Sequence, residues 1–140
     1  MTGSTGPFVP SPIDLRLILR AAKAATFAHA PYSEYSVGAA LLAEKGRIVT
    51  GCNVENASYG LTLCAERAAI ASAVSLGLRR FRKIAIVGGK NQPAYPCGAC
   101  LQVLAEFCGP ELELILSTGE RRQSPMRFAL KDLFPCAFKL

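Results

Sequence analysis

The chain has 140 residues, of which 51% are apolar and 19% are charged, with a net charge of +6. This length suits one domain with a sizeable core, and the composition excludes a disordered chain. No apolar run reaches the roughly 18 residues of a membrane-spanning helix, and residues 1–12 lack the features of a secretory signal. We therefore expect a single cytoplasmic domain over residues 1–140, without a membrane partner and with a flexible N-terminal segment over residues 1–11.

The first helix is predicted to begin at Pro12, since proline suits the first helical position. Ser11 can cap this helix, and Asp14 can complete a capping box. Small and apolar residues follow at helical spacing. Pro31 is expected to end the helix.

Two strands and a second helix are expected next. The strands Tyr35–Ala43 and Gly46–Cys52 alternate or run apolar and are joined by a tight hairpin. Asn53–Gly60 is a polar loop. Thr62 can cap a helix over Leu63–Leu76, which the following glycine ends.

The second half of the chain alternates strands and helices. We expect a strand at Lys83–Val87, a helix at Cys97–Phe107, a strand at Leu112–Leu116, an edge strand at Ser124–Phe128 and a helical turn at Ala129–Leu133. The alternation predicts an α/β fold with a mixed sheet and helices on both faces. The two apolar strands suit central positions that are covered on both sides.

The positive charge is concentrated in two clusters beside predicted strands. No aromatic ladder is interleaved with them beyond Phe81. Basic patches can bind nucleic acid, but this pattern favours a solvated surface or a subunit rim, and it would also suit an anionic ligand. The clusters consist of Arg79, Arg80, Arg82 and Lys83, and of Arg121 and Arg122.

The cysteines carry the clearest chemical signal. Thiols in a cytoplasmic protein stay reduced, and clustered cysteines then bind metal or act in catalysis. Cys97 and Cys100 form a C-x-x-C, which is half of a zinc site or a redox pair. The chain has no second C-x-x-C, and its one histidine, His29, ends an alanine-rich helix and is expected to be structural. Cys64 at a predicted helix start is the best third ligand, and three ligands leave the open position of a catalytic zinc.

The neighbours of Cys64 fit a catalytic centre. Both ligand groups lie at predicted helix N-termini, where exposed N–H groups favour thiolates. Arg67 can compensate their negative charge by donating to the sulfurs. Glu66 is a poor co-ligand of Cys64 at this spacing, but it can sit beside the metal as a general base. The alternative is that Glu66 and Arg67 form an ordinary surface pair.

The other cysteines stand singly among apolar neighbours. Small thiols in such surroundings usually pack in the core. This is the expected role of Cys52, Cys108 and Cys136.

These motifs resemble a known family. Cys64-x-Glu66 followed by Pro96-Cys97-x-x-Cys100 matches the signature of zinc-dependent nucleobase deaminases. From about Leu15 to Phe138 the chain is similar to the small homotetrameric cytidine deaminases. Further motifs that carry the resemblance are Tyr32-Ser33-x-Tyr35-x-Val37-Gly38-Ala39-Ala40-Leu41, Gly51-Cys52-Asn53-Val54-Glu55-Asn56-Ala57-Ser58-Tyr59 and Gln102 after the last cysteine.

The resemblance implies a three-layer α-β-α sandwich with a five-stranded mixed sheet, one Zn²⁺ per subunit and a homotetramer with shared sites. It implies hydrolytic deamination of cytidine and 2′-deoxycytidine to uridine and 2′-deoxyuridine in pyrimidine salvage, with Glu66 moving the protons. It also implies the substrate-binding residues: Asn53 and Glu55 at the ribose, Ala57 and Tyr35 at the base, and Tyr59 and Phe138 reaching a neighbouring subunit's site.

Two positions depart from the family pattern. Leu101 stands where an arginine usually follows the last ligand, so Arg67 has no partner in compensating the thiolates. Tyr35 replaces a usual phenylalanine and keeps the ring. Two other functions stay open: deamination of another cytosine-bearing molecule, and a zinc-containing module that binds or edits a nucleic acid. The ribose-binding pair of Asn53 and Glu55 favours nucleosides over the first of these, and sites closed by neighbouring subunits would exclude the nucleic acid polymer of the second.

Overall fold

The computed structural model describes residues 5–120 and 122–140. Arg121 of the second basic cluster and residues 1–4 of the N-terminal segment lie outside these ranges. The helices and strands are β1 (Gly6–Pro7), α1 (Pro12–Ala25), β2 (Val37–Ala43), β3 (Ile48–Cys52), α2 (Ala65–Ser75), β4 (Phe81–Gly88), α3 (Gly98–Phe107), β5 (Glu113–Ser117), β6 (Met126–Ala129) and α4 (Leu130–Leu133), with single 3₁₀ turns at Glu44–Gly46 and Tyr59–Leu61.

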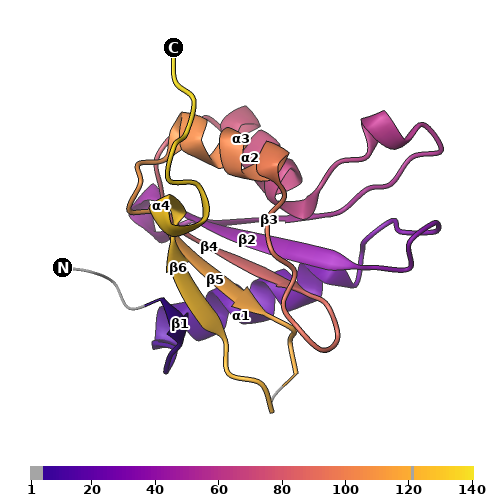
Figure 1. Ribbon diagram of the computed structural model, residues 1–140, viewed down its shortest axis with the longest axis horizontal. Coiled ribbons are helices and arrows are strands. Elements are labelled where there is room, and N and C mark those ends of the chain that lie inside the picture. The colour runs from indigo at the N-terminus through magenta and orange to yellow at the C-terminus, as the bar shows by residue number, and fades with distance from the viewer. Residues whose placement is uncertain (1–4, 121) are drawn as a thin grey trace.

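The strands form one mixed sheet in the order β1-β6-β5-β4-β2-β3. Among the strands of the described residues, β4 and β5 pair in parallel through a crossover that contains α3, and the other strand pairs are antiparallel. Helix α1 covers one face of the sheet, and α2 and α3 lie on the other (Figure 1). The predicted three-layer sandwich is therefore confirmed. The five expected strands are β2–β6, and the two-residue β1 adds a sixth.

The core is divided by the sheet into two parts, as the period of two along each strand requires. On β2, Leu41 faces α2 and α3, whereas its neighbour Ala40 faces α1. On β4, Ile84 and Ala85 alternate in the same way. The central strands are thus covered on both faces, as their apolar sequences predicted.

Two glycines bring the helices close to the sheet. A Cβ at Gly38 would lie 1.9 Å from the carbonyl oxygen of Ala21 in α1. A Cβ at Gly51 would lie 2.4 Å from the backbone nitrogen of Ala69 in α2. Because neither position leaves space for a methyl group, these glycines set the spacing of the layers on opposite faces.

Two predicted helix boundaries were wrong. Helix α1 ends at Ala25 instead of continuing toward Pro31, because the next residues form tighter bonds to the carbonyl three positions back. Helix α2 begins at Ala65 with Cys64 as its N-cap, not Thr62. The reason is that Leu63 pairs with Val54 through two backbone hydrogen bonds of 2.8 and 2.9 Å.

The segment expected to be flexible is partly ordered. Gly6 and Pro7 form β1 and pair with β6, which is therefore not the edge strand that was predicted. Ser11 caps α1 in the expected capping box with Asp14. Within the described residues, no helix combines the length and apolar character needed to cross a membrane.

A buried carboxylate ties α1 to the centre of the sheet. Asp14 is only 3% exposed and accepts hydrogen bonds from Ser11 and, at 2.8 Å, from Lys83 on β4. Lys83 also lies 3.2 Å from Glu113 on β5, so it is not the solvated surface residue expected of the first basic cluster. Burial alone would raise the pKa of Asp14, but the hydrogen bonds from Lys83 and Ser11 outweigh it and hold this pKa below its ordinary value of 3.8.

Replacing Asp14 with asparagine is expected to lower the free energy of unfolding by about 2–3 kcal/mol at pH 7, because a charge-assisted hydrogen bond is lost in a buried setting. The lowered pKa means that the ionised carboxylate stabilises the fold above pH 3.8 and ceases to do so as the pH falls below that value. Urea unfolding at pH 7 and pH 3 measures both effects. If the difference in free energy of unfolding between wild type and Asp14→Asn were as large at pH 3 as at pH 7, this role of the charge would be contradicted.

Candidate active site and metal centre

Three cysteine sulfurs meet where two helices begin. Cys64 is the N-cap of α2, Cys97 is the N-cap of α3, and Cys100 lies in the first turn of α3. The Sγ atoms of Cys64 and Cys97 are 3.9 Å apart, and those of Cys97 and Cys100 are 3.5 Å apart. All three lie within 4.8 Å of one another. Two helix N-termini therefore direct their N–H groups toward one cluster, as predicted.

The dimensions of the cluster fit zinc. Tetrahedral coordination with Zn–S bonds of about 2.3 Å places the sulfurs about 3.8 Å apart, close to the two measured separations. Three thiolates from a C-x-x-C and a distant cysteine leave a fourth position for water or substrate, as in catalytic zinc sites. The participation of Cys64 favours a metal site over the alternative of a redox pair.

Arg67 supplies positive charge to the cluster. Its Nη2 atom donates to the Cys64 sulfur at 3.4 Å and to the Thr62 carbonyl oxygen at 3.2 Å. Hydrogen bonds from the Cys100 thiol and from Arg67 hold the pKa of Cys64 well below its ordinary value. The lowered pKa favours the thiolate of Cys64, which is the form that binds a metal.

Glu66 lies buried beside the cysteines. Its side chain is only 5% exposed, although it stands in the first turn of α2. Burial raises the pKa of this carboxyl, and the nearby Cys64 thiolate raises it further. A buried carboxyl of this kind can both accept and return a proton. With Arg67 bound to Cys64, this burial excludes an ordinary surface pair of Glu66 and Arg67.

The cluster opens into a cavity of about 310 Å³. Cys64, Cys97 and Glu66 lie in its wall together with polar residues from the segment before β2 and the segment after β3. A volume of this size is at the lower end for small-molecule sites. The lining residues are Ser33, Tyr35, Val37, Asn53, Glu55, Thr62, Cys64, Ala65, Glu66, Ala94, Tyr95 and Cys97.

Asn53 and Glu55 are held in place by backbone groups. Glu55 Oε1 accepts hydrogen bonds from the backbone N–H groups of Tyr32 and Ser33 at 3.1 and 3.0 Å, which lower its pKa. Asn53 Oδ1 accepts from the Val37 N–H, and its Nδ2 donates to the Tyr35 carbonyl, both at 2.8 Å. An amide offers four hydrogen bonds and a carboxylate about the same number, so both retain capacity for a ligand.

Three of the predicted substrate-binding residues do not line this cavity. Ala57 and Tyr59 lie on the segment between β3 and α2, which extends away from the sheet (magenta in Figure 1). Tyr59 is 77% exposed and contacts Tyr32 edge to face, and Phe138 is 67% exposed near the C-terminus. Two large exposed aromatic side chains are available to another molecule.

The remaining singled-out residues lie outside the site. Leu101 is buried in the core on the α3 side of the sheet. Cys52 and Cys108 are half-buried, whereas Cys136 is exposed and is not the core residue that was expected. His29 is exposed, and its backbone bonds to Asn53 and Glu55 fit the expected structural role.

Tyr95 is a cavity residue that sequence reasoning missed. Its ring packs edge to face on Phe128 at 5.8 Å, and its hydroxyl donates to the Met126 sulfur at 3.6 Å. These contacts to β6 hold Tyr95 as a wall of the cavity. Its position directly before Pro96-Cys97 was the available signal, but only the fold shows which way the ring points.

Comparison with known proteins gives consistent matches. The family model for the cytidine and deoxycytidylate deaminase zinc-binding region matches residues 12–115. The cytidine deaminase of Sporosarcina psychrophila is 50% identical over 102 residues, which cover 73% of this chain and 75% of that protein. The cytidine deaminase of Mycobacterium tuberculosis strain H37Rv is 48% identical over 120 residues, covering 86% and 85%.

Solved structures agree with these relatives. The crystal structure of cytidine deaminase from Burkholderia pseudomallei superposes with a TM-score of 0.82 at 46% identity, covering 89% of this chain and 98% of that one. The cytidine deaminase structure from Mycobacterium tuberculosis gives a TM-score of 0.75 at 45% identity, covering 90% and 97%. With the family match spanning most of the fold and including all three clustered cysteines, the chain belongs to the cytidine deaminase family.

Proposed function

We propose that this chain hydrolyses the C4 amino group of cytidine and 2′-deoxycytidine, giving uridine or 2′-deoxyuridine and ammonia. The observation that carries the proposal is one cavity with the clustered sulfurs of Cys64 and Cys97 and buried Glu66 in its wall, together with Asn53 and Glu55. The names of the relatives support the cytidine substrate. A reaction on free nucleosides is one of pyrimidine salvage, and we place it in the cytoplasm.

Cys64, Cys97 and Cys100 would hold one Zn²⁺ per subunit. When bound there, the metal supplies Lewis-acid chemistry that activates water at neutral pH. Glu66 accepts the proton that the attacking water loses, and it delivers that proton to N3 of the base. Once the water oxygen is bonded to C4, Glu66 takes the remaining proton from that C4 hydroxyl and donates it to the amino group, which leaves as ammonia as the C4–N bond breaks and the C4 carbonyl forms. Burial suits Glu66 to this exchange because the raised pKa lies closer to neutrality.

The sugar and the base are assigned to the rest of the cavity. Glu55 and Asn53 bind the ribose hydroxyls with the hydrogen-bonding capacity that their backbone partners leave. Tyr35 flanks the base from the cavity wall. Ala57 is assigned a backbone contact to the base, which requires its loop to close over the ligand.

Neighbouring subunits are proposed to complete each site in a homotetramer. The exposed rings of Tyr59 and Phe138 support shared sites, because packing within one subunit covers neither ring. Arg67 is assigned a supporting role through its hydrogen bond to Cys64. A site closed in this way admits a nucleoside and excludes a nucleic acid polymer.

The test is deamination by purified, zinc-loaded protein, followed by the loss of cytidine absorbance and by ammonia release. Cytidine and 2′-deoxycytidine are expected to react, and free cytosine is expected to react much more slowly because it lacks the sugar that Glu55 binds. In Glu55→Gln, turnover of both nucleosides is expected to fall about 10-fold or more in kcat/KM, since a charge-assisted hydrogen bond is weakened. Light scattering on the same preparation reports the assembly.

Zinc-loaded protein that leaves both nucleosides unchanged would refute the proposed substrates and favour another amino-pyrimidine. Equal rates on cytosine and cytidine would refute the role of Glu55. A fully active monomer would refute the shared sites while leaving the reaction intact.

A further inference from the structure

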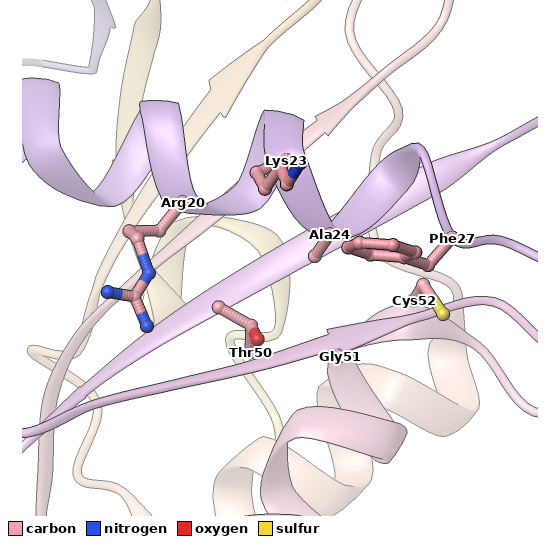
Figure 2. Close-up of a pocket in the computed structure, with 7 residues that line it drawn as sticks. All are labelled: Arg20, Lys23, Ala24, Phe27, Thr50, Gly51 and Cys52. Atoms are coloured by element: carbon pink, nitrogen blue, oxygen red, sulfur yellow. The ribbon is translucent and has the colours of Figure 1, made fainter.

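A second hollow is lined by Cys52, the residue directly before Asn53. It has a volume of about 490 Å³ and is formed by the last turns of α1 and the edge strand β3. Figure 2 shows Arg20 and Phe27 on either side of Thr50 in this view. The lining residues are Arg20, Lys23, Ala24, Phe27, Thr50, Gly51 and Cys52, and we refer to them as the α1–β3 groove. None of them belongs to the site described above.

The groove carries positive charge without a counter-charge. Arg20 and Lys23 are exposed, and no ion pair joins either of them to a carboxylate in the described part of the chain. The only acidic residue of α1 is Asp14, which is buried against Lys83. Two adjacent cations with a free threonine hydroxyl in reach of the same hollow match the donors that bind phosphate groups.

The groove also presents an aromatic ring. Phe27 is 68% exposed, and the Lys23 ammonium lies 5.3 Å from the centre of the ring. Arg20 and Phe27 are separated by seven positions, or about 10 Å at a helical rise. Aromatic side chains at one end of a basic groove stack on nucleobases. Arg20 therefore lies at one end of the groove and Phe27 at the other, with the Lys23 ammonium between them against the ring.

We propose that the α1–β3 groove binds a nucleoside di- or triphosphate, with the phosphates on Arg20 and Lys23 and the base on Phe27. Thr50 donates to a phosphate oxygen from the edge strand. The phosphates provide the affinity, and stacking on Phe27 distinguishes a nucleotide from inorganic polyphosphate.

The groove is connected to the catalytic cavity by a short backbone path. His29, two residues after Phe27, donates its N–H to the Asn53 carbonyl at 3.0 Å and accepts from the Glu55 N–H at 2.8 Å. Cys52 in the groove directly precedes Asn53. A ligand that shifts Phe27 or Cys52 therefore moves the two residues assigned to the ribose. Occupancy is expected to change the KM for cytidine and to leave kcat unchanged; this consequence rests on the proposed function.

The binding test is calorimetric titration of the zinc-loaded protein with magnesium–ATP and, separately, with inorganic tripolyphosphate, in the absence of cytidine. ATP is expected to bind more tightly than tripolyphosphate. Arg20→Gln/Lys23→Gln should weaken both by about 10-fold or more, because hydrogen bonds to charged groups are lost. Phe27→Leu should weaken ATP alone, by about 5-fold or more. Arg80→Gln/Arg82→Gln removes the same charge from exposed positions outside the groove and should leave both affinities within 2-fold.

Absence of ATP binding at millimolar concentration would overturn the proposal, and so would an equal loss in the Arg80→Gln/Arg82→Gln control. Equal binding of ATP and tripolyphosphate would overturn the assignment of the base to Phe27. In the kinetic arm, ATP should change the KM for cytidine at least 2-fold in wild type and not in Arg20→Gln/Lys23→Gln. ATP binding that depends on the groove in a protein without deaminase activity would refute the proposed function alone.

Discussion

Glu66→Gln is expected to retain zinc and fold while losing turnover of cytidine by at least about 10²–10⁴-fold, the usual contribution of one general acid–base group. The loss of turnover should be about 10⁴-fold or more, because the same carboxyl is assigned several proton transfers. Glutamine keeps the volume and the hydrogen-bonding shape of the buried side chain but cannot exchange a proton. The measurement is kcat by the loss of cytidine absorbance, with the zinc content determined on the same sample.

The matched control is Glu106→Gln on α3, which makes the same chemical change at an exposed position. It should leave kcat within 2-fold of wild type. Turnover retained within 10-fold in Glu66→Gln would refute the role of Glu66 in proton transfer. A loss of zinc in that variant would instead make Glu66 part of the metal site.

Cys64→Ala is expected to reduce zinc affinity by more than about 100-fold. Loss of a residue that only hydrogen-bonds a metal ligand costs up to about 100-fold, and this substitution removes a ligand itself. Only the C-x-x-C pair of Cys97 and Cys100 would remain, and two thiolates do not hold zinc in a catalytic site. The expected result is less than one zinc per chain after dialysis against a weak chelator, together with loss of turnover.

Cys108→Ala serves as the comparison, because this half-buried thiol lies at the end of α3 and outside the cluster. Burial raises its pKa to about 12, so it is a neutral thiol and a poor ligand. Its replacement should leave one zinc per chain. If Cys64→Ala kept zinc as firmly as Cys108→Ala does, the three-cysteine site would be disproved.

The clustering of the three cysteines could be predicted because its signals are local in the sequence. Cys97 and Cys100 are three residues apart at a helix start, and Cys64 and Glu66 stand together at another. The alternation of strands and helices predicted helices on both faces, and the fold places α2 and α3 on the same one. The capping residue and proline at the start of α1 likewise marked that boundary correctly.

Features that depend on distant pairing could not be predicted. Strand β1 exists because Gly6 and Pro7 reach β6 from the other end of the chain, and no local pattern encodes that pairing. Helix α2 begins at Ala65, two residues after the predicted start, because Leu63 pairs with Val54 in extended conformation. Tyr95 lies in the cavity wall because its ring packs on Phe128, which is 33 positions further along the chain.

The substrate-binding residues show a different limit. Motif matching assigned Asn53 to a ligand, but its amide also joins the backbone of Val37 and Tyr35, so it shapes the cavity as well. Tyr59 and Phe138 were assigned to a neighbouring subunit's site, and both side chains are exposed in the structure. Such roles depend on an assembly whose geometry is not encoded in one subunit's strand and helix pattern.

The close contact at Gly51 bears on how this protein can evolve. An added methyl group there would push against Ala65 and Ala69, and Ala65 adjoins both Cys64 and Glu66. A displacement of about 1 Å at reacting groups can cost about 10²-fold in rate. Selection for catalysis is therefore expected to act on Gly51 of β3 as well, because Gly51 fixes the position of α2. Mutational tolerance in this enzyme therefore depends on what supports α2, and a map of substitutions that abolish deamination is expected to include Gly51 although it does not line the cavity.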